Sequence, residues 1–405
     1  MRSQSTTALL LAALGIRLWA GWAVGHFAHL APWEYEDIAN HVLAGEGYWY
    51  EHLGTAYRAF VLPVYPLFCA GVYRLTQHSQ PLLLILQCLV SAFACLQVRS
   101  IGRLACSPSS VATVAAWLLA LHPGLIFYAS RLHPLTLDLF ALLWMCESWL
   151  RLLRRPSAGH ALQAGLSSGF AILSRGTMLV FVAYGAGWFL WHAARRGHQA
   201  VRRLAIIGLV AGLIVAPWIA RNAAHFHGLV LQTTSGELLW RGNNPVATGS
   251  AYLADGRPVL AGAPEPFRRR LAELDEAGQS RVFRQEAWTF IRTHSWQALR
   301  LYGQKWLAFW WFSPQAGLTY PRGYLSGYAA YYVPVLLGAC LGLYALGRTG
   351  CSAEMTLLLG ALLTIAAAQS LYYVDGRHRW LVEPLLLLLS AVGWCALRRG
   401  AAIRS

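Results

Sequence analysis

Long runs of Leu, Ala and Val recur along the whole chain and are separated by short clusters of charged residues. Many runs approach the roughly 20 residues that a helix needs to cross the hydrocarbon core of a bilayer. Because the runs are continuous and do not alternate with polar residues, they favour helices over the strands of a barrel. We expect ten segments, near residues 8–30, 81–104, 110–130, 134–150, 160–174, 177–194, 204–220, 327–347, 354–373 and 380–397.

Composition supports the same class. Of the 405 residues, 57% are hydrophobic and only 12% are charged, whereas about 25% charged residues is usual in soluble domains. The predicted fold class is all-α: a polytopic integral membrane protein of about ten transmembrane helices, with interfacial helices in the outward loops. We expect residues 1–405 to form a single membrane domain. Segments 160–174 and 177–194 are short, so they form either two spans or a shallow hairpin around Ser174-Arg175-Gly176.

Arginine dominates the formal charge of +16, and Lys305 is the only lysine. This excess favours membrane topology and contact with anionic lipid over nucleic acid as a partner. If ten spans alternate, arginines near residues 99–103, 151–155, 195–203, 348 and 398–404 share one side, which we assign to the cytoplasm. Loop 31–80, the link near Arg131, loop 221–326 and the turn 375–379 then face outward together. We therefore expect a plasma (inner) membrane protein whose chemistry lies on the extracytoplasmic, or periplasmic, side.

The two long outward loops show helical patterns. One apolar stripe at helical spacing predicts a helix on the membrane surface in the first loop, with an acidic stripe beside it and a stop at Gly45. The apolar stripe consists of Tyr35, Ile38, Ala39, Val42 and Leu43, and the polar one of Glu34, Asp37 and His41. The second loop contains a Gly/Asn/Pro-rich stretch, 236–266, and a predicted aromatic-rich helix over 282–311 that should also lie along the membrane.

Acidic residues are concentrated in the first loop, where five of the chain's 17 lie between Trp33 and Glu51. A carboxylate at a membrane surface suits general-base catalysis, because it accepts the proton of an attacking hydroxyl or amine. Glu34 and Asp37 share the predicted face, while Glu36 points elsewhere and caps or solvates. The alternative interpretation is an acidic helix face that is simply solvated.

Arginines on the same side offer a counterpart for an anion. Arg58 precedes the rigid stretch 63–66 that re-enters the membrane, Arg221 closes the seventh predicted span, and Arg377 and Arg379 open the last one. The planar guanidinium group matches phosphate oxygens. The alternative is that they only anchor helix ends. Asp138 lies close enough to the surface to join the site, and its expected partner is Arg17.

The chain contains no phosphate-binding GxxxxGK[ST] loop, no GxGxxG dinucleotide motif and no HExxH zinc motif. We expect no required cofactor, although a divalent cation near the acids is compatible with the sequence.

Several segments carry a family resemblance. The acidic helix from Tyr35 to Tyr48 is followed by Arg58 and Pro63-Val64-Tyr65-Pro66. Further matches are Pro217-Trp218-Ile219-Ala220-Arg221-Asn222, Gly242-Asn243-Asn244-Pro245-Val246-Ala247-Thr248-Gly249 and Arg377-His378-Arg379-Trp380-Leu381-Val382-Glu383-Pro384. In this order they resemble membrane glycosyltransferases of GT-C fold, in the bacterial protein-mannosyltransferase and aminoarabinose-transferase-like (PMT-like and ArnT-like) superfamily.

The resemblance implies inverting transfer of a sugar from a polyprenyl-phosphate donor to a lipid, glycan or protein acceptor. It implies an acidic base among Glu34, Glu36 and Asp37. Many members have an Asp-Glu pair where this chain has Ala31 and Pro32, so we expect Glu34 or Asp37 to act instead. Candidate phosphate ligands are Arg58, Arg221, Arg377 and Arg379, and candidate substrate contacts are Tyr35, Tyr57, Tyr65, Asp138 and Asn243. The alternatives are a lipid-linked sugar carrier or flippase, and a degenerate member that serves as an assembly partner.

Overall fold

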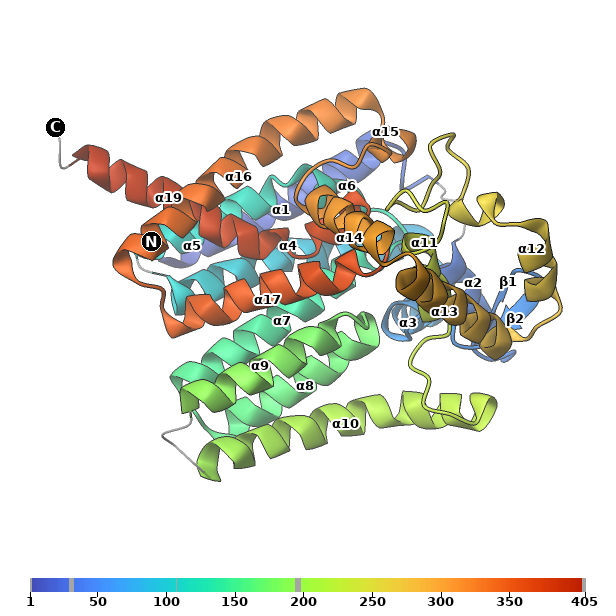
Figure 1. Ribbon diagram of the computed structural model, residues 1–405. Helices are drawn as coiled ribbons and strands as arrows, with labels where there is room; N and C mark the ends of the chain where they lie inside the picture. Colours follow the sequence, from blue (N-terminus) through green and yellow to red (C-terminus); the bar gives the residue numbers. More distant parts are fainter. Residues whose placement is uncertain (1, 29–32, 107, 194–197, 403–405) are drawn as a thin grey trace.

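The computed structural model describes residues 2–28, 33–106, 108–193 and 198–402, and long helices dominate it (Figure 1). Five helices are long and apolar enough to cross a membrane: α1 (Arg2–Ala23), α4 (Gln80–Ala105), α10 (His198–Phe226), α16 (Arg322–Thr349) and α17 (Ala353–Ser370). The other predicted segments coincide with α5 (Ser109–Ala120) and α6 (Pro123–Ala129), α7 (Leu135–Arg154), α8 (Ala158–Ser174), α9 (Met178–Ala193) and α19 (Glu383–Ala402). The predicted multi-pass helical membrane fold is therefore confirmed.

The span expected at 110–130 is broken. Its two halves, α5 and α6, meet at a 56° bend beside His122 and Pro123. Proline has no amide hydrogen and restricts the residue before it, so it ends α5 and begins a new helix. The short segments 160–174 and 177–194 form two separate helices, α8 and α9, which pack against each other.

Glycines let neighbouring helices approach closely in the bundle. A Cβ atom at Gly342 of α16 would lie 2.1 Å from the carbonyl oxygen of Leu389 in α19, and one at Gly165 of α8 would lie 2.8 Å from Cβ of Val210 in α10. Inside a bilayer the hydrophobic effect does not drive helices together, because lipid tails are as apolar as the side chains. Close backbone packing of this kind is therefore a main source of helix association.

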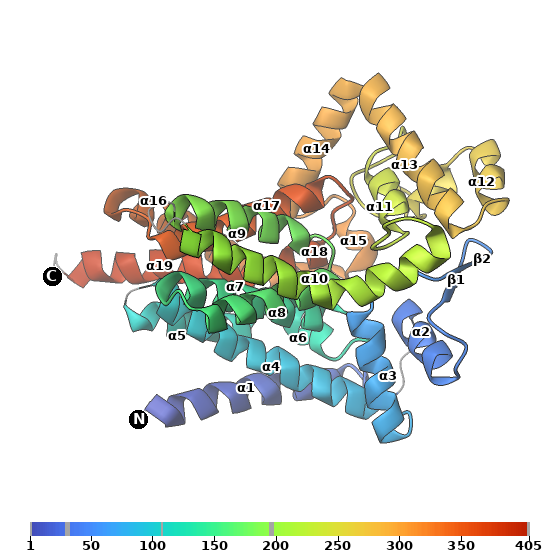
Figure 2. The ribbon, with the colours of Figure 1, turned by 90° about the horizontal axis from the view of Figure 1, so that it is seen from below.

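The arginine-rich connections lie together at one end of the bundle, as the spacing predicts. In Figures 1 and 2 the α7–α8 and α16–α17 connections lie at that end with both termini. Arg154, at the end of α7, forms an ion pair of 3.0 Å with Glu354, near the start of α17. Residues 195–196 and 403–405 lie outside the described part of the chain.

The first outward loop contains α2 (Glu34–Leu43), a hairpin and α3 (Val64–Thr76). Three acids in the first turn of α2 favour its start there, because the helix dipole stabilises negative charge at the N-terminus. The hairpin, strands β1 (Tyr50–His52) and β2 (Thr55–Tyr57), is a departure from the all-helical prediction. Its two-residue turn, Leu53-Gly54, has positive φ at both positions, as a tight hairpin requires.

The second outward loop is more structured than its composition predicts. The stretch 236–266 includes most of α11 (Ser235–Gly242) and the 3₁₀ helix η2 (Val259–Gly262), followed by α12 (Glu265–Ala272). The single helix predicted over 282–311 is wrong: α13 (Glu276–Thr293) and α14 (Ser295–Trp310) meet at His294, whose backbone is not helical. The side chain of Asp275 caps the N-terminus of α13, so the helix begins at Glu276, upstream of the predicted start at residue 282.

Beyond this hairpin of helices, α15 (Ala316–Thr319) leads into α16, and α18 (Gly376–Trp380) precedes α19. Figure 2 shows α11, α12 and α13 gathered at the end of the bundle opposite the arginine-rich connections, with α2 and the β-hairpin beside them. The outward pieces therefore converge as predicted.

Candidate active site

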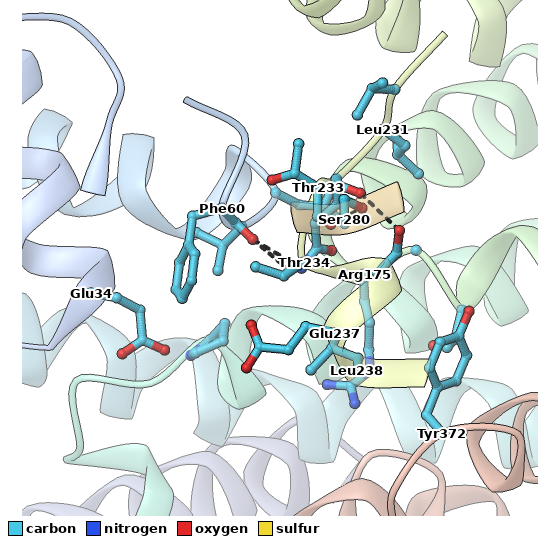
Figure 3. A pocket seen from close by; sticks show the side chains of 18 of the residues that line it. Glu34, Phe60, Arg175, Leu231, Thr233, Thr234, Glu237, Leu238, Ser280 and Tyr372 are labelled. Carbon is cyan, nitrogen blue, oxygen red and sulfur yellow. Dashed lines mark hydrogen bonds between the residues drawn. The ribbon is translucent and has the colours of Figure 1, made fainter. Parts of the chain in front are cut away.

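A cavity of about 970 Å³ lies where the outward pieces meet. Its walls come from the first loop, the α6–α7 link, the α8–α9 link, the second loop and the residues around α18. Segments that are far apart in the sequence thus enclose one space (Figure 3).

Glu34 lines this cavity from the first position of α2. Burial raises the pKa of Glu34, and the charges of Arg377, Arg241 and His52 act in the opposite direction. Among the residues that the structure describes, no cation lies within ion-pair distance of its carboxylate. In Figure 3 the carboxylates of Glu34 and Glu237 point toward one another across the cavity. Glu34 is therefore available to accept a proton.

The other two predicted acids do not line the cavity. Glu36 is buried and accepts hydrogen bonds from the Tyr73 hydroxyl and from Nε2 of Gln80, at 3.3 Å, so it ties α2 to α3 and α4. Asp37 lies beside Tyr50, whose pKa is raised by burial and by the charges of Glu34 and Asp37. The predicted pairing of Glu34 with Asp37 on a common catalytic face is not what the geometry shows.

Of the predicted phosphate ligands, only Arg377 reaches the cavity. Its Nη2 lies 3.4 Å from Asp375 and 3.5 Å from the Tyr373 hydroxyl. Arg379 is two positions further along α18, on nearly the opposite side. It is buried, forms an ion pair of 2.7 Å with Glu383, and donates to the carbonyl of Trp311 at 2.8 Å. Arg379 therefore fixes the start of α19 in place.

Arg58 and Arg221 lie in a second, smaller cavity, away from Arg377. Nη1 of Arg221 donates to the carbonyl of Arg58 at 2.7 Å. The expectation that these four arginines form one cluster is corrected by this placement.

The predicted substrate contacts divide in the same way. Tyr35, Tyr65 and Asp138 line the main cavity. Tyr57 does not, because its hydroxyl donates to the side chain of Gln279 in α13. Asn243 is also turned away: its amide donates to the carbonyl of Leu371 at 2.7 Å and its oxygen accepts from Lys305 at 3.1 Å.

The expected ion pair between Arg17 and Asp138 is wrong. Asp138 pairs instead with Arg175, at 3.2 Å, and accepts a hydrogen bond of 2.5 Å from Ser174. Arg17 donates to Ser91 at 2.7 Å and to the carbonyl of Ala120 at 3.3 Å. Since α5 stops at Ala120, its last carbonyls have no partner within the helix and attract a cation.

The sequence prediction missed an ionic cluster on α11. Glu237 accepts from Arg241 at 2.6 Å and from His52 at 2.9 Å, and all three side chains line the cavity. Burial opposes ionisation of Glu237, but Arg241 and His52 outweigh it and lower its pKa to about 2. Glu237 and Arg241 are four residues apart, so they share one face of a helix, and this spacing was the signal in the sequence that could have identified the pair.

Two further groups were also missed. Arg281 and Arg284, one turn apart on α13, line the cavity opposite the membrane bundle. His133 and His378 line it from the bundle side. Burial and the charges of neighbouring arginines hold the pKa of both imidazoles well below the usual range, so both are neutral at physiological pH.

A divalent cation has no recognisable ligand set in the described residues, where no group of three His, Cys, Asp and Glu side chains comes together. Ala31 and Pro32, at the positions of the family's acid pair, lie outside the described residues.

The fold places the chain in the GT-C class of membrane proteins, as the sequence resemblance implies. The chain has this fold: it matches the archaeal oligosaccharyltransferase AglB from Archaeoglobus fulgidus, solved with an inhibitory peptide and a dolichol-phosphate, with a TM-score of 0.56. Identity is 13%, and the match covers 99% of this chain but only 51% of AglB. The chain therefore spans about half the length of that protein.

Other similarities agree with the resemblance seen in the sequence. Residues 61–220 match the family model of dolichyl-phosphate-mannose-protein mannosyltransferase. ArnT from Cupriavidus metallidurans is 16% identical to the chain. Its apo structure matches with a TM-score of 0.42 over 97% of this chain and 78% of ArnT. Its structure bound to undecaprenyl phosphate matches with a TM-score of 0.45 over 96% of this chain and 77% of ArnT. No curated protein sequence matches the chain. The chain therefore has the GT-C fold, as expected, and its residues 61–220 are similar to the protein mannosyltransferases.

Proposed function

We propose that this protein is an inverting glycosyltransferase that moves a sugar from a polyprenyl-phosphate donor to an acceptor at the outer face of the plasma membrane. The observation that carries the proposal is Glu34, a carboxylate without an ion-pair partner among the described residues, in a large cavity that also contains Arg377. The GT-C fold and the dolichol-phosphate in the AglB structure support the choice of donor.

Glu34 is the proposed general base. Its carboxylate takes the proton of the acceptor hydroxyl or amine as that group attacks the anomeric carbon, and the bond from that carbon to the phosphate oxygen breaks. The bonding electrons leave with the polyprenyl phosphate. Because burial raises the pKa of Glu34, the carboxylate is a stronger base than an exposed glutamate would be.

Arg377 is the proposed partner of the departing phosphate, since it lines the cavity and its contacts with Asp375 and the Tyr373 hydroxyl are long, at 3.4 and 3.5 Å. A fixed positive charge at the leaving group stabilises the negative charge that develops there. Arg241 and Arg175 are already paired with Glu237 and Asp138, so they shape the cavity's field more than they offer free donors.

Substitution of the base tests the proposal. In protein purified in lipid nanodiscs, we expect Glu34→Gln to lower sugar transfer by at least ~100-fold, the usual contribution of a general base, with donor binding retained. Asp37→Asn is the matched control and should retain most of the transfer, since Asp37 does not line the cavity. Unchanged transfer by Glu34→Gln would disprove the assignment of the base.

The pH dependence gives a second measurement. Only the ionised form of Glu34 accepts a proton, so kcat/KM should fall as the pH drops through a pKa above the ordinary glutamate value, and the Gln variant should lack this limb. If the wild-type protein moves the donor across a bilayer but never consumes it, the carrier interpretation replaces the enzyme. If it neither moves nor consumes any polyprenyl-phosphate sugar, an assembly role does.

A further inference from the structure

The second cavity, of about 330 Å³, lies at the outward end of α10. Its walls are the loop before β1, the hairpin strand β2 with the residue that follows it, and the last turns of α10. The lining residues are Glu46, Gly47, Tyr48, Trp49, Ala56, Arg58, Arg221 and His225. Three of these side chains are basic and one is acidic.

Arg221 is the inner wall of this cavity, and only neutral groups hold it. Its guanidinium donates to the carbonyls of Arg58 at 2.7 Å and Tyr48 at 2.9 Å, and to the side chain of Asn222 at 2.8 Å. It also lies over the Trp218 ring, 4.9 Å from the ring centroid. A half-buried cation held by carbonyls and rings retains its full charge toward the open side.

The charge of Glu276 acts on Arg221, but within the described residues the nearby acids form no ion pair with it. Both oxygens of Glu276 accept hydrogen bonds from the backbone amides of Arg58 and Ala59, at 2.6 and 2.8 Å. Glu46 points toward His41, at 3.9 Å, and is largely exposed. Within the described residues, neither Arg58 nor Arg221 has a carboxylate within 4.0 Å. The cavity therefore favours an anion.

The position of the cavity indicates where the anion comes from. α10 is a 29-residue apolar helix, and only 17% of its most hydrophobic window is buried inside the protein, so most of that window faces lipid. The cavity opens at its outward end, next to Trp49, where headgroups and interfacial aromatics lie. Figure 2 shows this end of α10 reaching past the bundle toward the β-hairpin.

We propose that this cavity binds the phosphate of an anionic glycerophospholipid from the outer leaflet, held by Arg58, Arg221 and His225. The bound headgroup would join the end of α10 to the hairpin. Phe60, Val61 and Leu62 begin two residues after Arg58 and line the main cavity, so an occupied lipid site steadies one wall of the candidate active site. This proposal is independent of the proposed function, because the main cavity contains neither arginine.

Lipid retention by the full-length protein tests it. In nanodiscs of phosphatidylcholine with a minor fraction of phosphatidylglycerol, native mass spectrometry should detect a tightly held phosphatidylglycerol. We expect Arg58→Gln with His225→Gln to weaken its binding by roughly tenfold or more, since the phosphate loses the charged donor of Arg58 and the imidazole donor of His225. Arg221 is left intact in this variant because it also supports the surrounding loops.

The control makes the same two kinds of substitution, both in α10. His198→Gln with Arg202→Gln removes exposed basic side chains at the opposite end of this helix and should leave the tightly held lipid in place. Equal losses in both variants, or equal retention of phosphatidylcholine, would show a non-specific charge effect and overturn the proposal. Displacement of the lipid by inorganic phosphate would identify a free-anion site. Displacement by a stoichiometric amount of polyprenyl phosphate would place Arg58 and Arg221 on the donor's path, and either result would refute a phospholipid site.

Discussion

At the scale of single residues, Glu237 shows how the cavity wall keeps a buried charge. Glu237 is 2% exposed, and its carboxylate lies between Arg241 and His52. The ion pair with Arg241 and the hydrogen bond from His52 offset the cost of burial, and removal of one member of such a cluster leaves the others without compensation. The cluster also links β1 to α11, and Arg241 lies over the ring of Tyr373, whose hydroxyl is 3.5 Å from Arg377.

We expect Glu237→Gln to destabilise the protein by about 3 kcal/mol at pH 7, the usual cost of breaking a buried ion pair. The pKa of Glu237 is lowered from its ordinary value of 4.5 to about 2, so its contribution to stability is complete above about pH 4.5 and is lost as the pH falls toward 2. Thermal unfolding of detergent-solubilised protein should therefore show a smaller acid-induced loss in the variant than in the wild type.

Glu265→Gln is the matched control for this prediction. Glu265 pairs with Arg268 and Arg269 on the surface of α12 and is about half exposed, and such pairs contribute little to stability. If both variants unfold alike at pH 7, the α11 cluster is not a stabilising feature.

The same scale shows where sequence reasoning succeeded and failed. Glu34 was one of three acids predicted for the site, and it is the one that lines the main cavity. Which of the three faces the cavity depends on contacts from other elements: Tyr73 of α3 and Gln80 at the start of α4 turn Glu36 inward. Those partners lie 37 and 44 positions away, and no local pattern specifies them.

At the scale of elements, hydrophobic periodicity located the long helices well. It did not reveal the break at His294 or the hairpin turn at Leu53-Gly54. Both depend on the backbone conformation of one or two residues, and the aromatic pattern continues across the break without interruption. Close packing of α16 on α19 was equally hidden, because a glycine in a membrane helix does not by itself indicate a contact.

Substitution of two glycines in α16 tests that packing. A Cβ atom at Gly342 would lie 2.1 Å from the Leu389 carbonyl oxygen, whereas one at Gly347 meets nothing within 4 Å. We expect Gly342→Ala to separate α16 from α19 and to cost about 1–3 kcal/mol, as overpacking usually does. Gly347→Ala should be neutral or slightly stabilising. Comparison of the two melting temperatures in one detergent gives the answer, and indistinguishable values would mean that the two helices are not closely packed at this point.

At the scale of the whole molecule, the distribution of arginines predicted that the outward pieces meet. It could not predict which arginines share a cavity. Arg377 reaches the main cavity while Arg58 and Arg221 form another, because loop conformation and the two-residue offset on α18 decide the direction of each side chain. Orientation in the membrane remains a prediction from the same distribution.

Thiol labelling in intact cells measures that orientation. In a background with the eight free cysteines replaced by serine, Asp255→Cys in the second outward loop should react with a membrane-impermeant maleimide. Ala158→Cys, at the start of α8 and also exposed, should react only after the cells are opened. The reverse pattern would place the main cavity in the cytoplasm.

The wide separation of the cavity's walls in the sequence has a consequence for biosynthesis. Lining residues run from Trp33 to His378, so the last wall is synthesised only after nearly all of the helices have entered the bilayer. A partly made chain therefore exposes Glu34 and its neighbours without the arginine that faces them. The cavity is therefore complete only after α18 has been synthesised and has packed against α6 and α14.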